Sequence, residues 1–299
     1  MSYMPKILLE KRLLQFLKED INYGDLTSEL VPNIPIHANI ISKQEGVVCG
    51  LNFAEILLKS MDIEVSSLFS DGDTIRTGDI VLQLRGLSHA ILVSERTILN
   101  LLMRLSGIAT QTQKLVNRIK QTGQKTILAS TRKTTPGFRY FEKYAVRIGG
   151  GDPHRWNLSD TVLIKENHLR LLGEEAIPTI LNQSKKITSF TKKVEIEVEN
   201  LSELSMALRA QPDIIMLDDF SNDEIQEAIT MVKQTSNQMY PLIEVSGGIT
   251  DQNIDDYIIP GIDIISIGML THSVTAIDFS LKIMKIQPLS STGEIELAD

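Results

Sequence analysis

The sequence predicts a mixed α/β protein in which a small N-terminal unit precedes an incomplete barrel of alternating strands and helices. In the second half of the chain, short apolar runs alternate with helical segments, which is typical of parallel β/α units. Polar or glycine residues follow each run, as in β/α barrels, whereas an open doubly wound sheet concentrates them at one switch point. About 145 residues are too few for the eightfold barrel.

Composition excludes several classes of protein. The chain has 299 residues, with 30 Lys+Arg against 38 Asp+Glu and a formal net charge of −8. This acidic balance argues against nucleic acid or an anionic membrane surface as a partner. No apolar run reaches the ~18 residues of a membrane span. A single cysteine, Cys49, rules out an internal disulfide and favours the cytoplasm; after Val47 and Val48 we expect it to be buried and inert.

The N-terminal unit, residues 1–110, is predicted to be α+β. Leucines at helical spacing from Leu8 to Leu17 indicate an amphipathic helix that ends near Asp20. Short strands separated by glycine turns follow over 37–89, with one helix near 53–61.

The barrel is assigned to residues 111–269. A long helix is predicted over 94–120 with Ser94 as its N-cap. The predicted strands are 126–129, 161–164, 194–198, 214–217, 242–245 and 262–267, and helices are expected at 203–210, 223–233 and 252–258. Period-two alternation over 277–283 predicts a further strand, within a segment 270–288 that returns to the N-terminal unit. The tail after Pro288 is expected to be loose.

Basic residues concentrate in one part of the acidic chain. Residues 132–170 hold eight positive side chains (Arg132, Lys133, Arg139, Lys143, Arg147, Arg155, Lys165, Arg170) and four negative ones (Glu142, Asp152, Asp160, Glu166), a local charge of +4. Arg139, Glu142 and Lys143 have helical spacing and are expected to form a solvated face. Four of the other basic residues lie at strand ends or beside Gly149-Gly150-Gly151, and we expect these four to form an anion pocket: Arg132, Lys133, Arg155 and Lys165.

Other strand ends carry further candidates. Ser246-Gly247-Gly248, predicted to open a helix, offers free backbone N–H groups to a phosphate, and Gly268 on the next strand supports this. Glu197 and Asp218 end neighbouring strands. General acid–base work, Mg²⁺ ligation and charge balance for the lysines all remain open for them. His154 and His168 are the histidines closest to these candidates.

These residues carry a family resemblance. The motifs are Thr131-Arg132-Lys133-Thr134-Thr135-Pro136-Gly137, Lys143-Tyr144-Ala145-Val146, Gly149-Gly150-Gly151 with His154-Arg155, Leu163-Ile164-Lys165-Glu166-Asn167-His168, Glu195-Ile196-Glu197-Val198-Glu199, Leu217-Asp218 and Ser246-Gly247-Gly248. In this order they resemble quinolinate phosphoribosyltransferase, also called nicotinate-nucleotide pyrophosphorylase (carboxylating). Gly24-Asp25-Leu26-Thr27, Glu95-Arg96-Thr97 and Leu105-Ser106-Gly107-Ile108-Ala109-Thr110 extend the match upstream.

The resemblance implies a fold and a reaction. The fold is a small α/β sandwich plus an incomplete α/β barrel, the type II phosphoribosyltransferase architecture. The reaction converts quinolinate and phosphoribosyl pyrophosphate to nicotinate mononucleotide, pyrophosphate and CO₂ in NAD biosynthesis, with Mg²⁺ as cofactor.

The resemblance also implies residue roles. Arg132, His154, Arg155 and Lys165 would hold the quinolinate carboxylates, with Lys133 between quinolinate and the phosphoribosyl donor. Glu197 and Asp218 would bind ribose hydroxyls and Mg²⁺. The 5′-phosphate would contact Ser246, Gly247, Gly248, Ile267, Gly268 and Met269. Arg96 would reach into the site of a neighbouring subunit, because the family forms dimers or hexamers.

The chain departs from the family pattern at two places. The stretch Asp152-Pro153-His154-Arg155-Trp156-Asn157 differs from the commoner Asn-His-Arg-x-Gly form, and Asp219 replaces a frequent Asn. Three competing functions also fit some of the same residues. A related molybdenum-transport-associated family shares the triple-glycine and His-Arg elements. The strand-end position of Lys165 is compatible with a Schiff-base lyase, and the basic cluster is compatible with a non-catalytic anion-binding relative.

Overall fold

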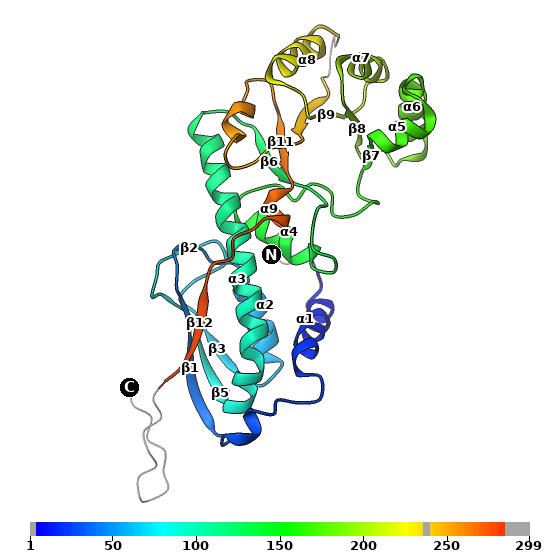
Figure 1. Ribbon diagram of the computed structural model, residues 1–299. Helices are drawn as coiled ribbons and strands as arrows, with labels where there is room; N and C mark the ends of the chain where they lie inside the picture. Colours follow the sequence, from blue (N-terminus) through cyan, green and yellow to red (C-terminus); the bar gives the residue numbers. More distant parts are fainter. Residues whose placement is uncertain (1–3, 236–239, 285–299) are drawn as a thin grey trace, which may run out of the picture. The chain divides into compact units, whose positions relative to one another are not determined.

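The structure is a computed structural model that describes residues 4–235 and 240–284. It divides into two compact units, which are drawn in Figure 1. Unit 1 comprises Met1–Thr110 and Thr275–Asp299, and unit 2 comprises Gln111–Val274. The predicted loose tail after Pro288 lies outside the described residues.

Unit 1 is built on an antiparallel sheet with the strand order β12-β1-β5-β3. Its strands are β1 (Pro35–Ser42), β3 (Glu64–Ser66), β5 (Ile80–Leu87) and β12 (Phe279–Ile283), and β2 (Gly46–Val47) pairs with β4 (Thr74–Ile75). Its helical elements are α1 (Lys6–Ile21), the short 3₁₀ helix η1 (Ser28–Leu30) and α2 (Leu51–Lys59). The buried leucines of α1 are Leu9, Leu13 and Leu17, so the expected amphipathic helix is present.

Strand β12 joins unit 1 from the far end of the chain. It runs antiparallel to β1, with Ile40 opposite Leu281 and Ser42 opposite Phe279. Figure 1 shows this red strand beside the blue β1. The predicted return to the N-terminal unit is therefore present, and unit 2 is an insertion between β5 and β12 of unit 1.

Helix α3 (Ser88–Gln121) begins before its predicted start. Ser94 is buried inside the helix, and its Oγ donates to the carbonyl of Ile91 at 3.0 Å. The prediction of Ser94 as N-cap is therefore wrong, because a helical serine can bond back to the preceding turn instead of capping.

Unit 2 is built on a six-stranded parallel sheet with the order β6-β11-β10-β9-β8-β7. The strands are β6 (Ile127–Ser130), β7 (Val162–Ile164), β8 (Val194–Val198), β9 (Ile214–Asp218), β10 (Leu242–Ser246) and β11 (Ile264–Ile267), which confirms the predicted positions. Strands β6 and β7 stand at opposite ends of this order, so the described strands form an incomplete barrel. A parallel bridge between Ala129 and Asp152 places the segment after α4 beside β6.

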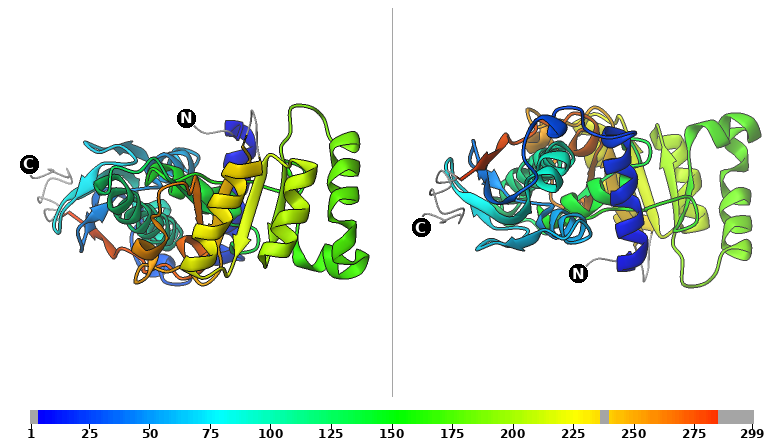
Figure 2. Two further views of the ribbon diagram at one scale, coloured as in Figure 1. Left: turned by 90° about the horizontal axis from the view of Figure 1, so that it is seen from above. Right: turned by 90° about the horizontal axis from the view of Figure 1, so that it is seen from below.

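The helices of unit 2 follow the strands. They are α4 (Arg139–Ile148), α5 (Glu166–Leu172), α6 (Ile177–Ile187), α7 (Leu201–Ala210), α8 (Asn222–Thr235) and α9 (Met269–His272), with 3₁₀ turns η2 (Glu174–Ala176) and η3 (Ile254–Tyr257). Figure 2 shows α6, α7 and α8 side by side along the strands. The helix expected at 252–258 is only the turn η3, and Ser246-Gly247-Gly248 therefore opens no α-helix. Any phosphate affinity of this loop must come from local N–H groups.

Two sequence expectations concern burial and membranes. Cys49 is fully buried, and burial raises the pKa of its thiol well above the ordinary value, which agrees with an inert side chain. Among the described residues, every helix is too short or too polar to serve as a membrane span.

Candidate active site

A cavity of about 310 Å³ opens at the carboxyl ends of the unit 2 strands. It is lined by predicted site residues from six different segments: Arg132, Lys133, His154, Arg155, Lys165, Glu197, Asp218 and Ser246. Ser130, Thr131, Leu163, Met216, Glu244 and Ser266 complete its wall. Parallel strands bring their carboxyl ends to one edge, which is why residues far apart in sequence meet here.

Lys165 and Glu197 form an ion pair across neighbouring strands β7 and β8. The Glu197 side chain is almost buried, whereas that of Lys165 remains partly exposed to the cavity. A lysine side chain engaged in an ion pair with a carboxylate is a poor nucleophile, which disfavours a Schiff-base lyase.

Asp218 ends strand β9 beside this pair. Burial raises the pKa of its carboxyl group, and the neighbouring carboxylates Glu197 and Asp219 raise it further. The crowding of like charges means that a cation in this cavity would be stabilised. Carboxylates that share a cavity with basic side chains suit Mg²⁺, which is usually held by one or two carboxylates and by substrate phosphates. Because Glu197 is engaged with Lys165, Asp218 is the freer ligand of the two.

Two guanidinium groups converge on the same cavity. Arg155 is buried, and burial together with the positive charge of Arg132 lowers its pKa. The Nε atom of Arg132 is buried and has no hydrogen-bond partner in the described part of the chain. A buried donor without a partner, next to a second guanidinium, indicates an anion site that a ligand would satisfy.

The segment 152–155, which holds His154 and Arg155, is fixed by the buried Lys143 of α4. The Lys143 ammonium donates to the carbonyl oxygen of Pro153 and, at 3.3 Å, to Ser130 Oγ. Glu142 Oε2 accepts from the backbone N–H of Thr135 at 3.1 Å. Both Glu142 and Lys143 are fully buried, so the predicted solvated face is wrong. Helical spacing identified a shared face, but the loops that cover α4 bury it.

Burial of Lys143 has a measurable consequence. Burial, followed by repulsion from Arg139, lowers the pKa of Lys143 from 10.5 to about 8. Between these values the unfolded chain binds more protons than the folded protein, so stability attributable to Lys143 rises with pH. We expect wild type to gain about 2 kcal/mol in free energy of unfolding, relative to Lys143→Met, between about pH 7.5 and 9.5.

Urea titrations at both pH values measure this difference. Lys11→Met, which changes an exposed lysine of α1, is the control and should follow wild type at both values. A constant gap between wild type and Lys143→Met would contradict the expected behaviour.

His154 lies between buried carboxylates. Its Nε2 is 3.2 Å from Glu244 Oε2 and 3.6 Å from Glu195 Oε2. Burial alone lowers the pKa of His154, but the hydrogen bond and the charges of both glutamates raise it overall. Burial and the charge of Glu244 raise the pKa of Glu195 well above its usual range.

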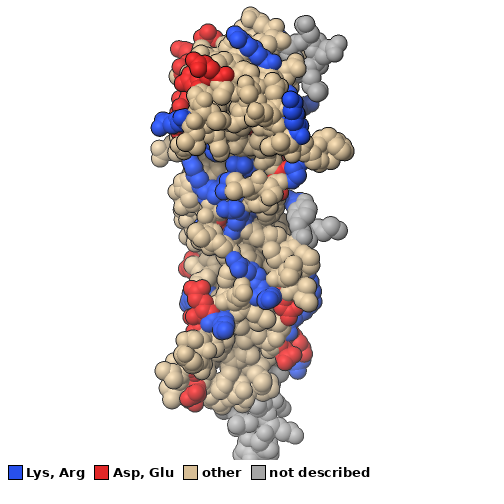
Figure 3. Space-filling view, turned by 90° about the vertical axis from the view of Figure 1, so that its right-hand side faces the viewer, with Lys and Arg blue, Asp and Glu red and all other residues tan. Residues whose placement is uncertain are grey.

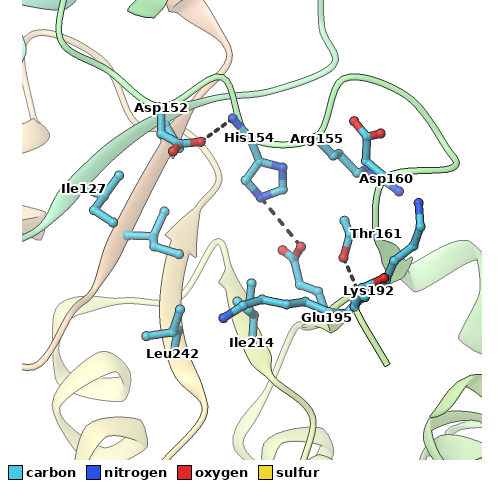
Figure 4. Close-up of a pocket in the computed structure, with 14 residues that line it drawn as sticks. Ile127, Asp152, His154, Arg155, Asp160, Thr161, Lys192, Glu195, Ile214 and Leu242 are labelled. Atoms are coloured by element: carbon cyan, nitrogen blue, oxygen red, sulfur yellow. Dashed lines mark hydrogen bonds and ion pairs between the residues drawn. The ribbon is translucent and has the colours of Figure 1, made fainter. Parts of the chain in front are cut away.

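A second cavity, of about 370 Å³, lies at the amino-terminal ends of the same strands. Its wall includes the strand-starting residues Ile127, Ile214 and Leu242, together with Glu195. Figure 4 shows the His154 ring directed toward Glu195 in this cavity. His154 and Arg155 line both cavities, so the segment 152–155 forms part of the partition between them.

The second candidate histidine has a local role. His168 Nδ1 accepts from the backbone N–H of Lys165 at 2.9 Å, and the backbone N–H of His168 donates to the Lys165 carbonyl at 2.8 Å. His168 therefore caps the first turn of α5 and fixes the backbone of Lys165.

The glycine residues predicted for phosphate lie next to the cavity. Gly247 has φ +90° and packs against Asp219, and Gly268 packs against the Lys133 side chain. Gly248 is exposed, and the Met269 sulfur accepts from the backbone N–H of Asp251 at 3.2 Å.

Two further residues of the predicted set stand apart from the cavity wall. The Ile267 side chain is buried, so only its main chain could face a ligand. Arg96 lies on α3 within unit 1, and its side chain is exposed. Neither lines the cavity of unit 2.

Surface charge is unevenly distributed, as the sequence suggested. Figure 3 shows a face on which Lys and Arg side chains gather in one stretch with few Asp and Glu side chains among them. The net charge of −8 therefore does not describe every part of the surface.

Sequence reasoning missed Glu244, Glu195 and Lys143 as parts of the site. Glu195 and Glu244 are fully buried in strands β8 and β10. A charged residue inside an apolar strand, as in Leu242-Ile243-Glu244-Val245, was the available signal, because a buried carboxylate is rare without a partner or a function.

Comparison with known families gives two matches that cover most of the chain. Residues 25–106 match "Quinolinate phosphoribosyl transferase, N-terminal domain". Residues 108–282 match "Quinolinate phosphoribosyl transferase, C-terminal domain".

Individual relatives agree with these matches. A probable nicotinate-nucleotide pyrophosphorylase [carboxylating] of Archaeoglobus fulgidus is 43% identical over 264 residues, 88% of this chain and 99% of the relative. The human nicotinate-nucleotide pyrophosphorylase [carboxylating] is 35% identical over 283 residues, 94% of this chain and 93% of the relative. The solved nicotinate-nucleotide pyrophosphorylase of Francisella tularensis superposes with a TM-score of 0.86 at 40% identity, covering 95% of this chain and 98% of that one.

Proposed function

We propose that the unit 2 cavity carries out the reaction of the quinolinate phosphoribosyltransferase family. The chain belongs to this family. The enzyme transfers phosphoribosyl from phosphoribosyl pyrophosphate to quinolinate with decarboxylation, giving nicotinate mononucleotide, pyrophosphate and CO₂ for NAD biosynthesis. The observation that carries the assignment is the meeting of Arg132, Arg155 and Lys165 with the carboxylates Glu197 and Asp218 in one cavity. A molybdenum-transport role and a lyase activity gain no support from the matches.

Quinolinate carries two adjacent carboxylates, and the basic side chains suit such a dianion. Arg132 and Arg155 would bind carboxylate oxygens through paired N–H groups, and Lys165 and His154 would add point charges. Lys133 is exposed at the cavity wall and would contact the phosphoribosyl donor. Held in this way, the ring nitrogen would face the anomeric carbon of the donor, which replaces an entropically costly encounter by a positioned one.

Two charge changes then require stabilisation. Departure of pyrophosphate develops positive charge on the ribose, which the carboxylates Glu197 and Asp218 would stabilise. After the bond to nitrogen forms, the cationic pyridinium stabilises the carbanion left by loss of CO₂ from the 2-position. This carbanion then takes up a proton from solvent to give nicotinate mononucleotide. The chain therefore needs to supply mainly orientation and charge, and no protein nucleophile.

Magnesium is the cofactor that this site fits. Asp218, with Glu197, would hold it, and when bound it would neutralise charge on the departing pyrophosphate. The 5′-phosphate of the donor would lie against Ser246, Gly247, Gly248 and the main chain of Ile267, Gly268 and Met269. The raised pKa of Asp218 supports a cation site, because a divalent ion would relieve the crowding of carboxylates.

Further parts of the proposal concern assembly and location. We infer a homo-oligomer, a dimer or hexamer, in which Arg96 of one subunit completes the site of another. The exposed side chain of Arg96 supports this, because it is available for contact with a second subunit. A cytoplasmic location is supported by the single buried cysteine and the biosynthetic reaction.

An assay of pyrophosphate release tests the function. We expect release that requires quinolinate and Mg²⁺, and a loss of kcat/KM of about 100-fold or more when nicotinate replaces quinolinate. The reason is that the missing carboxylate would leave buried guanidinium groups without a partner. Equal turnover of the two acids would contradict the two-carboxylate pocket, and binding of quinolinate without pyrophosphate release would indicate a non-catalytic relative.

Subunit mixing tests the shared site. We expect Arg96→Ala and Lys133→Ala to be inactive alone, because each lacks one part of every site. After random exchange, about a quarter of wild-type activity should return in a dimer, since mixed dimers contain one intact site. Native mass spectrometry confirms the exchange. No recovery after confirmed exchange would show that Arg96 acts within its own subunit, and an active Arg96→Ala enzyme would show that Arg96 has no role in the site.

A further inference from the structure

A histidine and two glutamates from distant segments lie close together at the wall of the catalytic cavity. His154 Nε2 lies 3.2 Å from Glu244 Oε2 of β10 and 3.6 Å from Glu195 Oε2 of β8. Both glutamate side chains are fully buried, and the histidine side chain is 14% exposed. Glu244 and His154 line the catalytic cavity, so this contact reaches its wall.

The backbone of His154 is held in an uncommon conformation. Its φ is +53°, a left-handed value that is uncommon for any residue other than glycine, although histidine, asparagine and aspartate adopt it more often than most. The His154 N–H donates to Asp152 Oδ1 at 2.6 Å, and the preceding carbonyl, of Pro153, accepts from Ser130 Oγ at 3.1 Å. Such strain persists where surrounding contacts determine the geometry, and it is concentrated at functional sites.

Fold stability alone does not explain the two glutamates. Both carboxylate oxygens of Glu195 and Oε1 of Glu244 are buried and accept no hydrogen bond from the described residues. Buried carboxylates with unfilled acceptors destabilise a protein, and an apolar or amide side chain of similar size would serve the fold better. Their presence around His154 therefore requires a role in the site.

We propose that Glu244, assisted by Glu195, is a positioning residue that fixes the His154 ring for contact with a quinolinate carboxylate. The inference rests on the proposed function, in which His154 binds that carboxylate. The contact between Glu244 and His154 Nε2 restricts rotation of the ring, which lines the catalytic cavity. Glu244 itself acts through His154 and is not assigned a contact with substrate.

The same donor set, one nitrogen and two carboxylates within 4.8 Å, could be taken for a metal site. The positive charges around it oppose that interpretation. Lys143 acts electrostatically on His154, and Arg155 acts on Glu195. A histidine hydrogen-bonded to Glu244 and 3.6 Å from Glu195 balances part of the carboxylate charge without adding a divalent charge beside an ammonium and a guanidinium group.

A double-mutant cycle tests the proposal. Glu244→Gln keeps the shape of the side chain, and His154→Asn keeps a polar residue that tolerates positive φ. We expect Glu244→Gln to raise KM for quinolinate about tenfold and to change KM for phosphoribosyl pyrophosphate by less than about twofold. In the His154→Asn background, Glu244→Gln should have no further effect on KM for quinolinate, because the residue through which it acts is already lost.

Melting temperature and a matched variant separate positioning from a structural role. Glu244→Gln should melt no lower than wild type, because an amide replaces a carboxylate with an unfilled acceptor. Glu203→Gln, which changes a buried glutamate of α7, is the control and should leave KM for quinolinate unchanged. If Glu244→Gln fails to fold, Glu195→Gln takes its place in the double-mutant cycle with His154→Asn, and KM for quinolinate is measured in the same way.

Several outcomes would overturn the positioning role. They are additive effects on KM for quinolinate, an equal rise in KM for both substrates, and Zn²⁺-dependent stabilisation of the magnesium-free enzyme that Glu244→Gln abolishes. Absence of quinolinate-dependent pyrophosphate release by the wild-type enzyme would instead contradict the proposed function.

Discussion

Replacing Lys165 by methionine is expected to lower kcat/KM for quinolinate by at least about 100-fold. Two losses combine in this variant. The substrate loses a charge-assisted hydrogen bond, and Glu197, almost buried, loses the ammonium that pairs with it. An unpaired Glu197 would also repel the quinolinate carboxylates and would shift away from the position in which we propose that it stabilises the ribose cation.

Steady-state kinetics with each substrate varied in turn measures this effect. Lys59→Met is a matched control, because Lys59 also pairs with a glutamate, Glu55 at 2.5 Å, but on the solvent-exposed face of α2 in unit 1. Its kinetic constants should stay within about twofold of wild type, as surface ion pairs contribute little. A wild-type kcat/KM in the Lys165→Met enzyme would show that Lys165 does not contribute to binding quinolinate or to the reaction.

Replacing Gly247 by alanine is expected to distort the loop Ser246-Gly247-Gly248, which we propose binds the 5′-phosphate of the donor. A Cβ at this position would lie 2.6 Å from the backbone nitrogen of Asp219 and closer still to its Oδ1, and φ is +90°. The loop or the end of β9 must move, and a shift of about 1 Å in a substrate-positioning group lowers rates about 100-fold. We expect that loss in kcat/KM for phosphoribosyl pyrophosphate, together with about 3 kcal/mol of stability.

Two further glycines separate the causes of this loss. Gly123→Ala introduces a side chain at φ +76° into open space, so it should cost only about 1 kcal/mol and leave kinetics unchanged. Gly248→Ala adds a Cβ 3.7 Å from Asp219 Oδ1 at φ +54°, and should be tolerated far better than Gly247→Ala. Equal melting temperatures for Gly247→Ala and wild type would show that the loop accommodates the added carbon.

Much of the fold follows from local patterns in the sequence. The strands of unit 2 are short, mostly apolar runs separated by polar segments, so their positions were predictable from residue type, as was the alternation that marks β12. Local patterns failed where a residue has two local options. Ser94 can cap a helix or bond back within one, and the residues around it favour continuation of α3 toward Ser88.

Parts of the site were predictable for the same reason, and others were not. Arg132, Lys165 and Asp218 follow strand ends, and parallel strands bring such ends together. The contact between His154 and Glu244 spans 90 positions in sequence and depends on the path of the segment after α4. The spacing of residues along the sequence therefore does not predict a contact between two side chains so far apart. Burial of Lys143 likewise depends on the loops that cover α4.

The pairing of β12 with β1 determines the order in which the two units can fold during synthesis. When the ribosome has synthesised the chain as far as Val274, all of unit 2 has been made. Strand β1 then still lacks β12, one of its two neighbours in the sheet. Unit 2 can therefore fold first, although unit 1 begins earlier in the message. Until residues 279–283 emerge, the outer edge of β1 remains open to pairing with another nascent chain. A stop codon shortly after residue 274 should thus yield an aggregating product that contains an otherwise complete unit 2.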